Sequence, residues 1–400
     1  MARVSILTSH FFIDLAEVDG SDRILFGGAE RYQYELDRWL RLDGHVPVHY
    51  QGYAPVPENV YEARLKHAKK KHLPLPPEPR TDVFTKHWNG MEIVCIPNQD
   101  RGHYNSIPSL TRAFNQIALD ADLHIYFATH FCHPAVLPNS ISISHGIYWD
   151  FPYHPYHERW NEEEKKRFWE VNLFGFTAPD YCVSVDHNVP NVLRAIQPGA
   201  ESKIVVIPNF VDVKRFHPVE KNWDGIRVLF PRRSTLLRGF NHFTTAAKKL
   251  PEYQFVTCGD TVNPSSQSDI EENVKKVFPN LTSTHVGPDD MPSLYQSCDI
   301  AVIPTIGAEG SSLSEIEALA CGLPTIVSGV GGTCEFIIDG YNAIVWDPWH
   351  EDLAEVIKML AEDEPLRKKL SKNARETAME FDIEQWRKRW RRIIPPKVTP

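Results

Sequence analysis

Short apolar runs alternate with helix-like patterns along most of this chain, and this alternation constrains its fold more than any other feature. Strands separated by helices favour parallel sheets with helices covering their faces. We therefore predict an α/β fold. The strands are expected at residues 4–7, 92–96, 123–127, 140–144, 181–185, 204–207, 227–230, 255–258, 284–286, 300–304 and 324–328.

The length and composition favour two globular domains. A chain of 400 residues is long for one hydrophobic core, and the polar stretch at 214–223 precedes an expected strand, so we place a domain boundary after Asp212. The formal net charge of −9 argues against nucleic acid as the main partner, because duplex binding normally needs a basic face. Seven scattered cysteines, and an N-terminus that enters a strand without a signal-peptide pattern, lead us to expect a cytoplasmic protein.

The segment from Glu309 to Glu317 has the pattern of a loop that opens into a helix. Ser312 and Glu315 have the Ser-x-x-Glu spacing of a capping box, so we expect the helix to begin near Leu313. The first N–H groups of a helix lack intrahelical partners and carry the positive end of its dipole, which makes phosphate a suitable ligand. Taken alone, two glutamates at this spacing are more often solvated side chains of a surface helix.

A basic loop follows the expected strand at 227–230. Arg233 and Arg238 flank a turn there, and both guanidinium groups can converge on one diphosphate. Arginine suits this task because its planar fork donates two parallel hydrogen bonds to phosphate oxygens. Taken alone, these arginines are more often surface residues at the end of a strand.

Together these residues resemble the retaining nucleotide-sugar glycosyltransferases of the GT4 type, the glycosyl transferases group 1. Arg233 with Arg238-Gly239 matches the family's Arg-x4-Lys-Gly element, and Glu309 to Glu317 matches its Glu-x7-Glu element. The similarity spans nearly the whole chain and is strongest from 225 to 345. It also includes Pro208-Asn209-Phe210-Val211-Asp212, Gly322-Leu323-Pro324, Gly331-Gly332-Thr333-Cys334-Glu335, Asp339-Gly340, Gly27-Gly28-Ala29-Glu30 and Ser144-His145-Gly146.

The resemblance implies a GT-B architecture, in which two Rossmann-like domains with parallel sheets face each other across a cleft. It implies an acceptor-side domain of residues 1–212 plus 379–400, with a C-terminal helix that crosses back to it, and a donor-binding domain of residues 213–378. The implied reaction is transfer of a hexose from a nucleoside-diphosphate sugar to a glycan or lipid-linked acceptor, with retention at the anomeric carbon.

The resemblance also implies a role for each matching residue. Arg233 and Arg238 would neutralise the donor diphosphate, Glu317 would bind the ribose hydroxyls, and Glu309 would bind hydroxyls of the transferred sugar. The remaining expected donor contacts are the backbone of Gly310, Ser311, Ser312 and Leu313 at the diphosphate, Gly28 of the first loop, Gly287 near the base, and His145 beside the sugar and phosphate. Catalytic help would come from His145, Glu309, Arg233 and Arg238. These roles suit the chemistry, because negative charge grows on the leaving diphosphate as the sugar departs.

Four positions depart from the family pattern. The usual Lys is Arg238, and the usual Gly before Arg233 is Arg232, whose direction the sequence does not predict. Phe210 replaces a Gly, which suggests packing where the domains join, and Gly310-Ser311-Ser312 replaces Gly-Phe-Gly. These departures concern the donor more than the reaction.

No cofactor or metal is expected besides the nucleotide sugar. The base pocket is expected near 285–288, and family frequency favours a UDP-hexose, with UDP-glucose first. The acceptor would be chosen by the loops at 10–26 and 52–90, where 52–80 is rich in Pro and Lys and has the composition of an insertion. Asp120-Ala121-Asp122, the one Asp-x-Asp match, and the His130, Cys132, His133 group are better explained as structural turns and core side chains than as metal ligands.

Other function classes were weighed. Gly329-Val330-Gly331-Gly332 has too few residues after it for the helix of a dinucleotide-binding unit. On one helix, Glu309 and Glu317 would lie about 12 Å apart at about 1.5 Å per residue, beyond the roughly 5 to 9.5 Å used by glycosidases. A nucleotide-sugar epimerase of similar architecture and a non-catalytic sugar-binding or scaffold protein remain alternatives.

The last twenty residues form an expected amphipathic helix with Trp386 and Trp390 among five basic residues. One interpretation is a terminal helix that docks its tryptophans on the protein. The other is peripheral contact with an anionic membrane surface.

Overall fold

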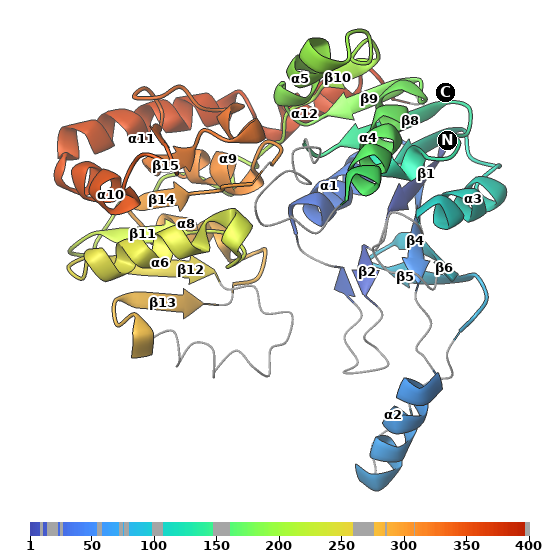
Figure 1. Ribbon diagram of the computed structural model, residues 1–400, viewed down its shortest axis with the longest axis horizontal. Helices are drawn as coiled ribbons and strands as arrows, with labels where there is room; N and C mark the ends of the chain where they lie inside the picture. Colours follow the sequence, from blue (N-terminus) through green and yellow to red (C-terminus); the bar gives the residue numbers. More distant parts are fainter. Residues whose placement is uncertain are drawn as a thin grey trace.

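The computed structural model describes residues 1–8, 11–13, 23–24, 27–53, 58–71, 75, 80–97, 107–146, 161–258, 276–284, 286–307 and 309–396. Two sheets, each flanked by helices, lie side by side (Figure 1). The predicted α/β class is confirmed. The predicted loops at 10–26 and 52–90 fall partly outside the described residues.

The first sheet has eight strands in the order β10-β9-β8-β7-β1-β4-β6-β5. All neighbours pair in parallel except β5, which is antiparallel to β6. The strands are β1 (Arg3–Thr8), β4 (Val46–Tyr53), β5 (Phe84–Trp88), β6 (Met91–Pro97), β7 (Leu123–Tyr126), β8 (Ser140–Ser144), β9 (Tyr181–Ser184) and β10 (Ile204–Val206). A separate hairpin joins β2 (Phe12–Ile13) to β3 (Arg23–Ile24).

The second sheet has six parallel strands in the order β13-β12-β11-β14-β15-β16. They are β11 (Arg227–Phe230), β12 (Gln254–Cys258), β13 (Leu281–Thr284), β14 (Ile300–Ile303), β15 (Thr325–Ser328) and β16 (Ile344–Trp346). From β11, the strands β12 and β13 are added on one side of the sheet, and β14, β15 and β16 are then added on the other side. Between β11 and β14 the direction of winding reverses, and ligands of open α/β sheets bind at such points.

Most of the helices pack their apolar faces on the two sheets and form a separate core on each, whereas α2 (Glu58–Lys71) does not. The helices are α1 (Gly28–Leu42), α2 (Glu58–Lys71), α3 (Ile107–Ile117), α4 (Glu162–Thr177), α5 (Asn188–Ile196), α6 (Phe240–Lys249), α8 (Met291–Gln296), α9 (Leu313–Ala320), α10 (Leu353–Glu362), α11 (Glu364–Met379) and α12 (Ile383–Trp390), with short 3-10 helices η1 (Thr129–Cys132), η4 (Leu236–Arg238) and η6 (Gly331–Cys334).

One predicted strand is wrong in position. The segment 284–286 was expected to be a strand, but β13 ends at Thr284 and Val286 lies outside it. Leu281 is buried and β13 pairs with β12 from that residue, so pairing with a neighbour outweighed the local apolar pattern. The sequence analysis also missed β2, β3, β4, β5 and β16.

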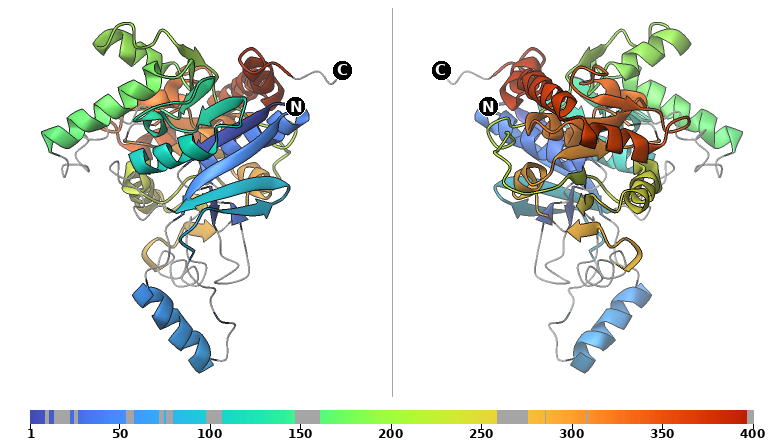
Figure 2. Two further views of the ribbon diagram at one scale, coloured as in Figure 1. Left: turned by 90° about the vertical axis from the view of Figure 1, so that its right-hand side faces the viewer. Right: turned by 90° about the vertical axis from the view of Figure 1, so that its left-hand side faces the viewer.

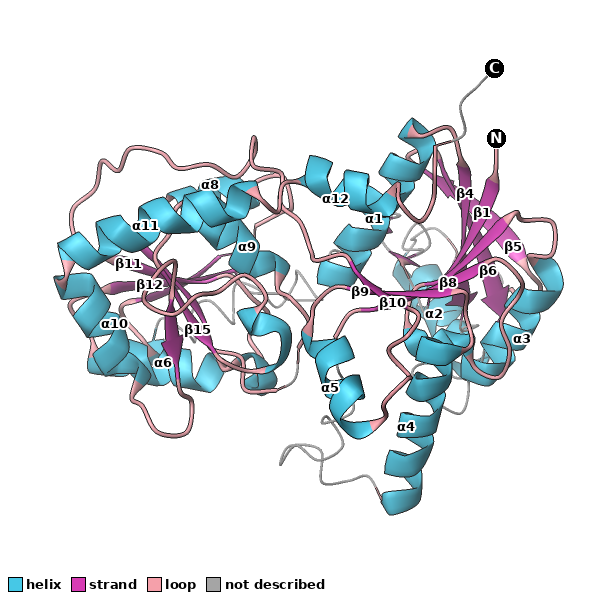
Figure 3. Cartoon of the chain, turned by 90° about the horizontal axis from the view of Figure 1, so that it is seen from above, coloured by secondary structure: helices cyan, strands magenta, loops and turns pink. Residues whose placement is uncertain are grey.

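The C-terminal helix α12 returns to the first sheet and lies beside α1 (Figure 3). Trp386 and Trp390 have no exposed surface, and both rings contact Trp39 of α1. The docking interpretation of this helix is therefore confirmed for both tryptophans. Arg391 forms an ion pair with Asp43 at the end of α1, with 2.6 Å between Nε and Oδ2.

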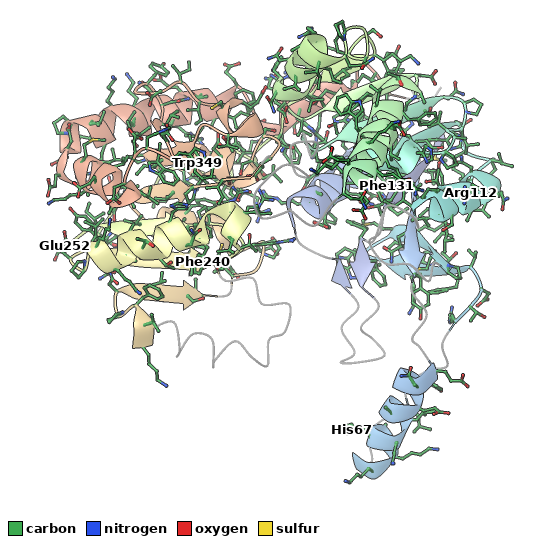
Figure 4. All side chains as sticks on the ribbon, in the orientation of Figure 1. His67, Arg112, Phe131, Phe240, Glu252 and Trp349 are labelled. Carbon is green, nitrogen blue, oxygen red and sulfur yellow. The ribbon has the colours of Figure 1, made fainter. Side chains whose placement is uncertain are left out.

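Helix α2 projects away from both sheets (Figures 1 and 2). Its side chains, including the labelled His67, lie apart from the two cores (Figure 4). This helix lies in the stretch that has the composition of an insertion. No helix among the described residues is long and apolar enough to cross a membrane.

Candidate functional site

The site is built at the carboxyl ends of β11 and β14, the two strands between which the order of the second sheet reverses. Arg232 and Arg233 follow β11 within three residues, and Glu309 lies on the loop between β14 and α9. Because β11 and β14 pair in parallel, their carboxyl ends lie at one edge of the sheet. Arg232 and Glu309, which are 77 positions apart in the sequence, are therefore brought together.

The carboxylate of Glu309 accepts hydrogen bonds at both oxygens. Oε1 faces Arg232 and also Arg238, whose Nη1 lies 2.5 Å away, and the Thr305 hydroxyl donates to Oε2 at 2.9 Å. Arg232 also donates to Thr305. Burial alone would raise the pKa of Glu309, but the two guanidinium groups and these hydrogen bonds lower it to about 2. Glu309 is thus ionised, and Arg232, whose direction the sequence left open, points at it.

The two predicted diphosphate arginines reach different parts of the site. Arg238 contacts Glu309, and 37% of its side chain is exposed. Arg233 reaches the first loop of the other sheet, because a Cβ atom added to Gly27 would lie 2.5 Å from its Nη2 atom. The two guanidinium groups therefore lie in different parts of the site: Arg238 at Glu309, and Arg233 toward α1.

Glu317, the second glutamate, is buried and its carboxylate is occupied at both oxygens. Arg31 of α1 donates to Oε1, and the Tyr295 hydroxyl of α8 donates to Oε2 at 3.0 Å. The Arg31 guanidinium also lies 5.4 Å from the centre of the Phe216 ring. Neither Arg31 nor Tyr295 was predicted, although Arg31 directly follows the Gly27-to-Glu30 motif.

Helix α9 begins at Leu313, as predicted, but its capping box does not form. Ser312 is the N-cap residue without a side-chain hydrogen bond to the helix, so the predicted capping box is wrong. Instead the loop is fixed from outside. The Ser311 hydroxyl donates to the carbonyl of Val185 at 2.5 Å, and Asn209 Nδ2 donates to the Ser311 carbonyl at 2.5 Å.

The loop before α9 touches the loop after β8 of the first sheet through glycine backbones. Gly146 has φ +125°, and a Cβ atom there would overlap the backbone of Gly310. Gly28, at the start of α1, faces Leu313, whose Cδ1 would lie 3.8 Å from a Cβ atom on that glycine. Gly28 and the segment from Gly310 to Leu313 are therefore brought to one place.

His145 lies beside this contact but directs its ring into the first sheet's core. Nε2 lies 3.1 Å from the Phe127 carbonyl, and the ring packs edge-on against Tyr32 with centroids 5.4 Å apart. If Nε2 donates to that carbonyl, Nδ1 is left as an acceptor. Burial lowers the pKa of His145 to about 4, so the imidazole is neutral near pH 7.

Gly287, predicted near the base pocket, is not in contact with these residues. It lies in the turn before α8, and the nearest atom to a Cβ added there is Oδ2 of Asp290, at 3.9 Å. Its connection to the site is indirect, because α8 carries Tyr295 to Glu317. His285, in the same predicted pocket, lies outside the described residues.

Two buried carboxyl groups at the site escaped the sequence analysis. Glu315 has no exposed surface and neither of its oxygens has a hydrogen-bond partner. Burial, and secondarily repulsion from Glu309, raise the pKa of Glu315 well above its usual range. Asp186, buried where β9 ends, has its pKa raised to about 6 chiefly by burial, and its Oδ2 would lie 2.8 Å from a Cβ atom on Gly332. The only sequence signal for Glu315 was its misleading capping-box spacing.

The groups weighed as metal ligands have structural contacts. Asp122 accepts a hydrogen bond from the Arg3 amide at 2.8 Å, and Asp120 forms an ion pair with the Arg3 side chain at 2.8 Å. His130 stacks on Phe131. Within the described ranges, no three His, Cys, Asp or Glu side chains are grouped so as to hold a metal ion.

The second sheet and its helices match a known family model. Residues 213–377 match the model described as glycosyl transferases group 1. The chain contains a glycosyl transferases group 1 domain. The resemblance drawn from the arginine and glutamate motifs is confirmed.

Curated relatives of this chain include transferases of different sugars. It is 32% identical over 201 residues to the N,N'-diacetylbacillosaminyl-diphospho-undecaprenol alpha-1,3-N-acetylgalactosaminyltransferase of Campylobacter jejuni, covering 46% of this chain and 51% of that protein. It is 28% identical over 202 residues to the D-inositol 3-phosphate glycosyltransferase of Paenarthrobacter aurescens, covering 46% and 49%. The chain thus aligns with about half the length of these relatives.

Solved structures share the fold of this chain over nearly its whole length. Sucrose-phosphate synthase from Thermosynechococcus elongatus superposes with a TM-score of 0.75 at 17% identity, over 98% of both chains. Anabaena HepE in complex with UDP and glucose superposes with a TM-score of 0.66 at 15% identity, over 98% of this chain and 99% of that one. The architecture is GT-B, with two Rossmann-like domains, as the motifs implied.

Proposed function

We propose that this chain transfers a hexose from a nucleoside-diphosphate sugar to a glycan or lipid-linked saccharide acceptor, with retention at the anomeric carbon. The domains we propose for this task are residues 1–212 with 379–400 on the acceptor side and 213–378 on the donor side.

One observation carries the proposal. Glu309 and Glu317 flank the start of α9, and guanidinium groups stand at both carboxylates. A helix start between two carboxylates suits a donor laid along it, with phosphates at the backbone N–H groups and sugar hydroxyls at each glutamate. We assign the transferred sugar to Glu309, the ribose to Glu317, and the diphosphate to Arg233, Arg238 and the backbone from Gly310 to Leu313.

The contacts of the two carboxylates add a condition to this assignment. Both oxygens of each are already hydrogen-bonded to protein groups. A donor must therefore exchange its hydroxyls for some of these partners when it binds. His145 enters the proposal as a neutral group, so the positive charge that assists the leaving diphosphate comes from the arginines.

We propose UDP-glucose as the first donor to test. The complex of Anabaena HepE contains UDP and glucose. The Campylobacter relative is named for a diphospho-undecaprenol substrate, which supports a lipid-linked saccharide as one acceptor class. No metal takes part in the proposed chemistry, because backbone dipoles and arginines can stabilise the leaving diphosphate.

The test begins with calorimetric titration of UDP, GDP and their glucose and mannose conjugates into the purified chain. Donor cleavage that depends on an added acceptor, with the anomeric configuration of the product read by NMR, supports retaining transfer. An altered sugar formed without acceptor would indicate an epimerase instead. The absence of any nucleotide binding would overturn the proposal.

A Glu309→Ala variant, with the exposed Glu376→Ala on α11 as control, ties the activity to the site. We expect transfer to fall with the first and to persist with the second. The assay is repeated with EDTA, and loss of turnover on chelation would contradict metal independence.

Peripheral membrane contact through α12 also stays a proposal, but fewer side chains of this helix are available for it than the sequence suggested. The tryptophans are buried, and Arg387 and Arg391 are paired with carboxylates, which leaves the exposed Lys388 and Arg392 on one face. Flotation with anionic liposomes should weaken in Lys388→Glu/Arg392→Glu. Unchanged flotation would remove α12 from the attachment.

A further inference from the structure

Arg31 of α1 forms an ion pair with Glu317 of the donor-side helix α9. It lies one helical turn after Gly28, and its Nη1 meets Oε1 of Glu317, a residue 286 positions further along the chain. The side chain of Arg31 is 21% exposed and that of Glu317 is 3% exposed. The guanidinium group is thus held inside the contact between the two halves of the molecule.

The ribose position assigned above to Glu317 conflicts with this ion pair. Tyr295 has a second acceptor, because its hydroxyl lies 3.1 Å from the Ser314 carbonyl as well as 3.0 Å from Glu317. Glu35, the carboxylate one turn after Arg31 on α1, already forms ion pairs with Arg38 at 2.9 Å and with Arg387 at 3.8 Å, and Arg31 would share it with both.

A buried guanidinium that loses its carboxylate needs another anion, because an uncompensated buried charge is strongly destabilising. The donor brings one in its diphosphate. The start of α1 also lies where that diphosphate is assigned, since Gly28 faces Leu313 and Gly27 comes close to Arg233. Arg31 and Glu317 are each one turn along their helices from that place, which is about 5.4 Å.

We propose that Arg31 is a donor-binding residue supplied by the acceptor-side domain. Its guanidinium group moves from Glu317 to the donor diphosphate when the ribose occupies Glu317. This inference rests on the proposed function. The exchange gives the Arg31 guanidinium an anion again, while the ribose hydroxyls and Tyr295 hydrogen-bond Glu317. It also adds a planar, bidentate donor to the leaving group. It also links donor binding to closure of the two domains, because Arg31 reaches the diphosphate only when α1 lies against α9.

A purely structural bridge makes a different prediction. If Arg31 only holds the two halves together, its loss weakens the binding of every ligand of the site alike. If Arg31 passes to the diphosphate, the loss of Arg31 weakens the binding of a ligand more, the more phosphates the ligand has. Binding of the nucleoside is spared, because the nucleoside then no longer competes with Arg31 for Glu317.

The experiment compares Arg31→Ala and Arg31→Lys with Arg38→Ala, an exposed arginine on the same helix. Uridine, UMP, UDP and UDP-glucose are titrated into each variant by calorimetry, with the guanosine series and GDP-mannose used if the wild type prefers that base. Circular dichroism verifies that each variant is folded.

We expect Arg31→Ala to weaken binding of the diphosphate and the nucleotide sugar by about tenfold or more, as for the loss of a charged hydrogen bond. Nucleoside affinity should stay equal or rise, Arg31→Lys should fall between, and Arg38→Ala should match the wild type. Millimolar guanidinium should restore part of the turnover of Arg31→Ala.

Equal losses for nucleoside and diphosphate, or no loss for the diphosphate, would overturn the role of Arg31 and leave the proposed function intact. A wild-type chain that binds no nucleotide in either series would overturn both.

Discussion

Trp386 of α12 packs on Phe210, with the two ring centroids 4.5 Å apart. Phe210 lies in the stretch that leads from the first sheet to the second, and it also contacts Tyr32 of α1. The C-terminal helix and the crossing between the two sheets therefore share one aromatic cluster. At this position the family pattern has glycine, whereas in this chain the Phe210 ring packs on Trp386 and so holds α12 against the first sheet's domain.

Trp386→Ala should lower the free energy of unfolding by about 3–5 kcal/mol, because it removes a fully buried aromatic side chain. Chemical denaturation measures the loss. Trp349→Ala is the control, since 66% of Trp349 is exposed and its loss should change stability by less than about 0.5 kcal/mol. Equal effects of the two substitutions would contradict the docking of α12.

Glu309→Gln should destabilise the chain by about 3–5 kcal/mol at pH 7, because it leaves Arg232 and Arg238 facing no carboxylate. The folded-state pKa of Glu309 is lowered to about 2, so its contribution is complete above the unfolded value near 4.5 and is lost as the pH falls toward 2. Denaturation of both proteins from pH 7 to 3 should show the difference shrinking below about pH 4.5. A constant difference would argue against an ionised Glu309.

Glu315→Leu should raise the free energy of unfolding by about 1–3 kcal/mol at pH 7.5, since it removes a buried carboxyl group without partners. A raised pKa means that the folded chain keeps a proton that the unfolded chain has lost, so wild-type stability declines as the pH rises above about 4.3. The gain in the variant should therefore be smaller at pH 4.5 than at pH 7.5. Glu355→Gln, at the equivalent position of α10, should show no such gain. Destabilisation by Glu315→Leu would indicate a partner for this carboxyl.

His145 should titrate near pH 4 in the folded chain, which NMR of histidine-labelled protein can measure. Because burial lowers its pKa, the unfolded chain takes up this proton first as the pH falls below about 6.5, and stability declines from there toward pH 4. His145→Gln should be less sensitive to acid over this range. His350→Gln, whose side chain is 82% exposed, is the control. Titration of His145 near pH 6.5 would contradict the buried ring.

Local patterns predicted much of the donor side of the site. The start of α9 at Leu313 was expected from the Ser312 and Glu315 spacing, and it is correct although that capping box does not form. Gly322 ends the helix with φ +67°, a conformation in which glycine has no steric penalty. The strands before Arg232 and Glu309 were also placed correctly, because buried parallel strands have continuous apolar runs. Where such a run was weak, as at β13, the prediction was wrong.

The partners of the carboxylates were beyond local patterns. Glu315 has the spacing of a capping residue, yet it lies buried without a partner, because the loop before α9 is fixed by Val185 and Asn209 instead. Similarly, a basic and aromatic helix such as α12 can dock on a protein or on a membrane. The neighbouring Trp39 and Phe210 show that Trp386 docks on the protein.

The sequence by itself determined the alternation of strands and helices, the group 1 motifs and the spacing of Glu309 and Glu317, because all of these depend on residues close together in the chain. The tertiary structure alone decided that Arg232 faces Glu309 and that Arg31 faces Glu317. The physical reason is that buried carboxylates take whichever cations the packing of the two sheets brings within reach, and one of those cations comes from 286 residues away.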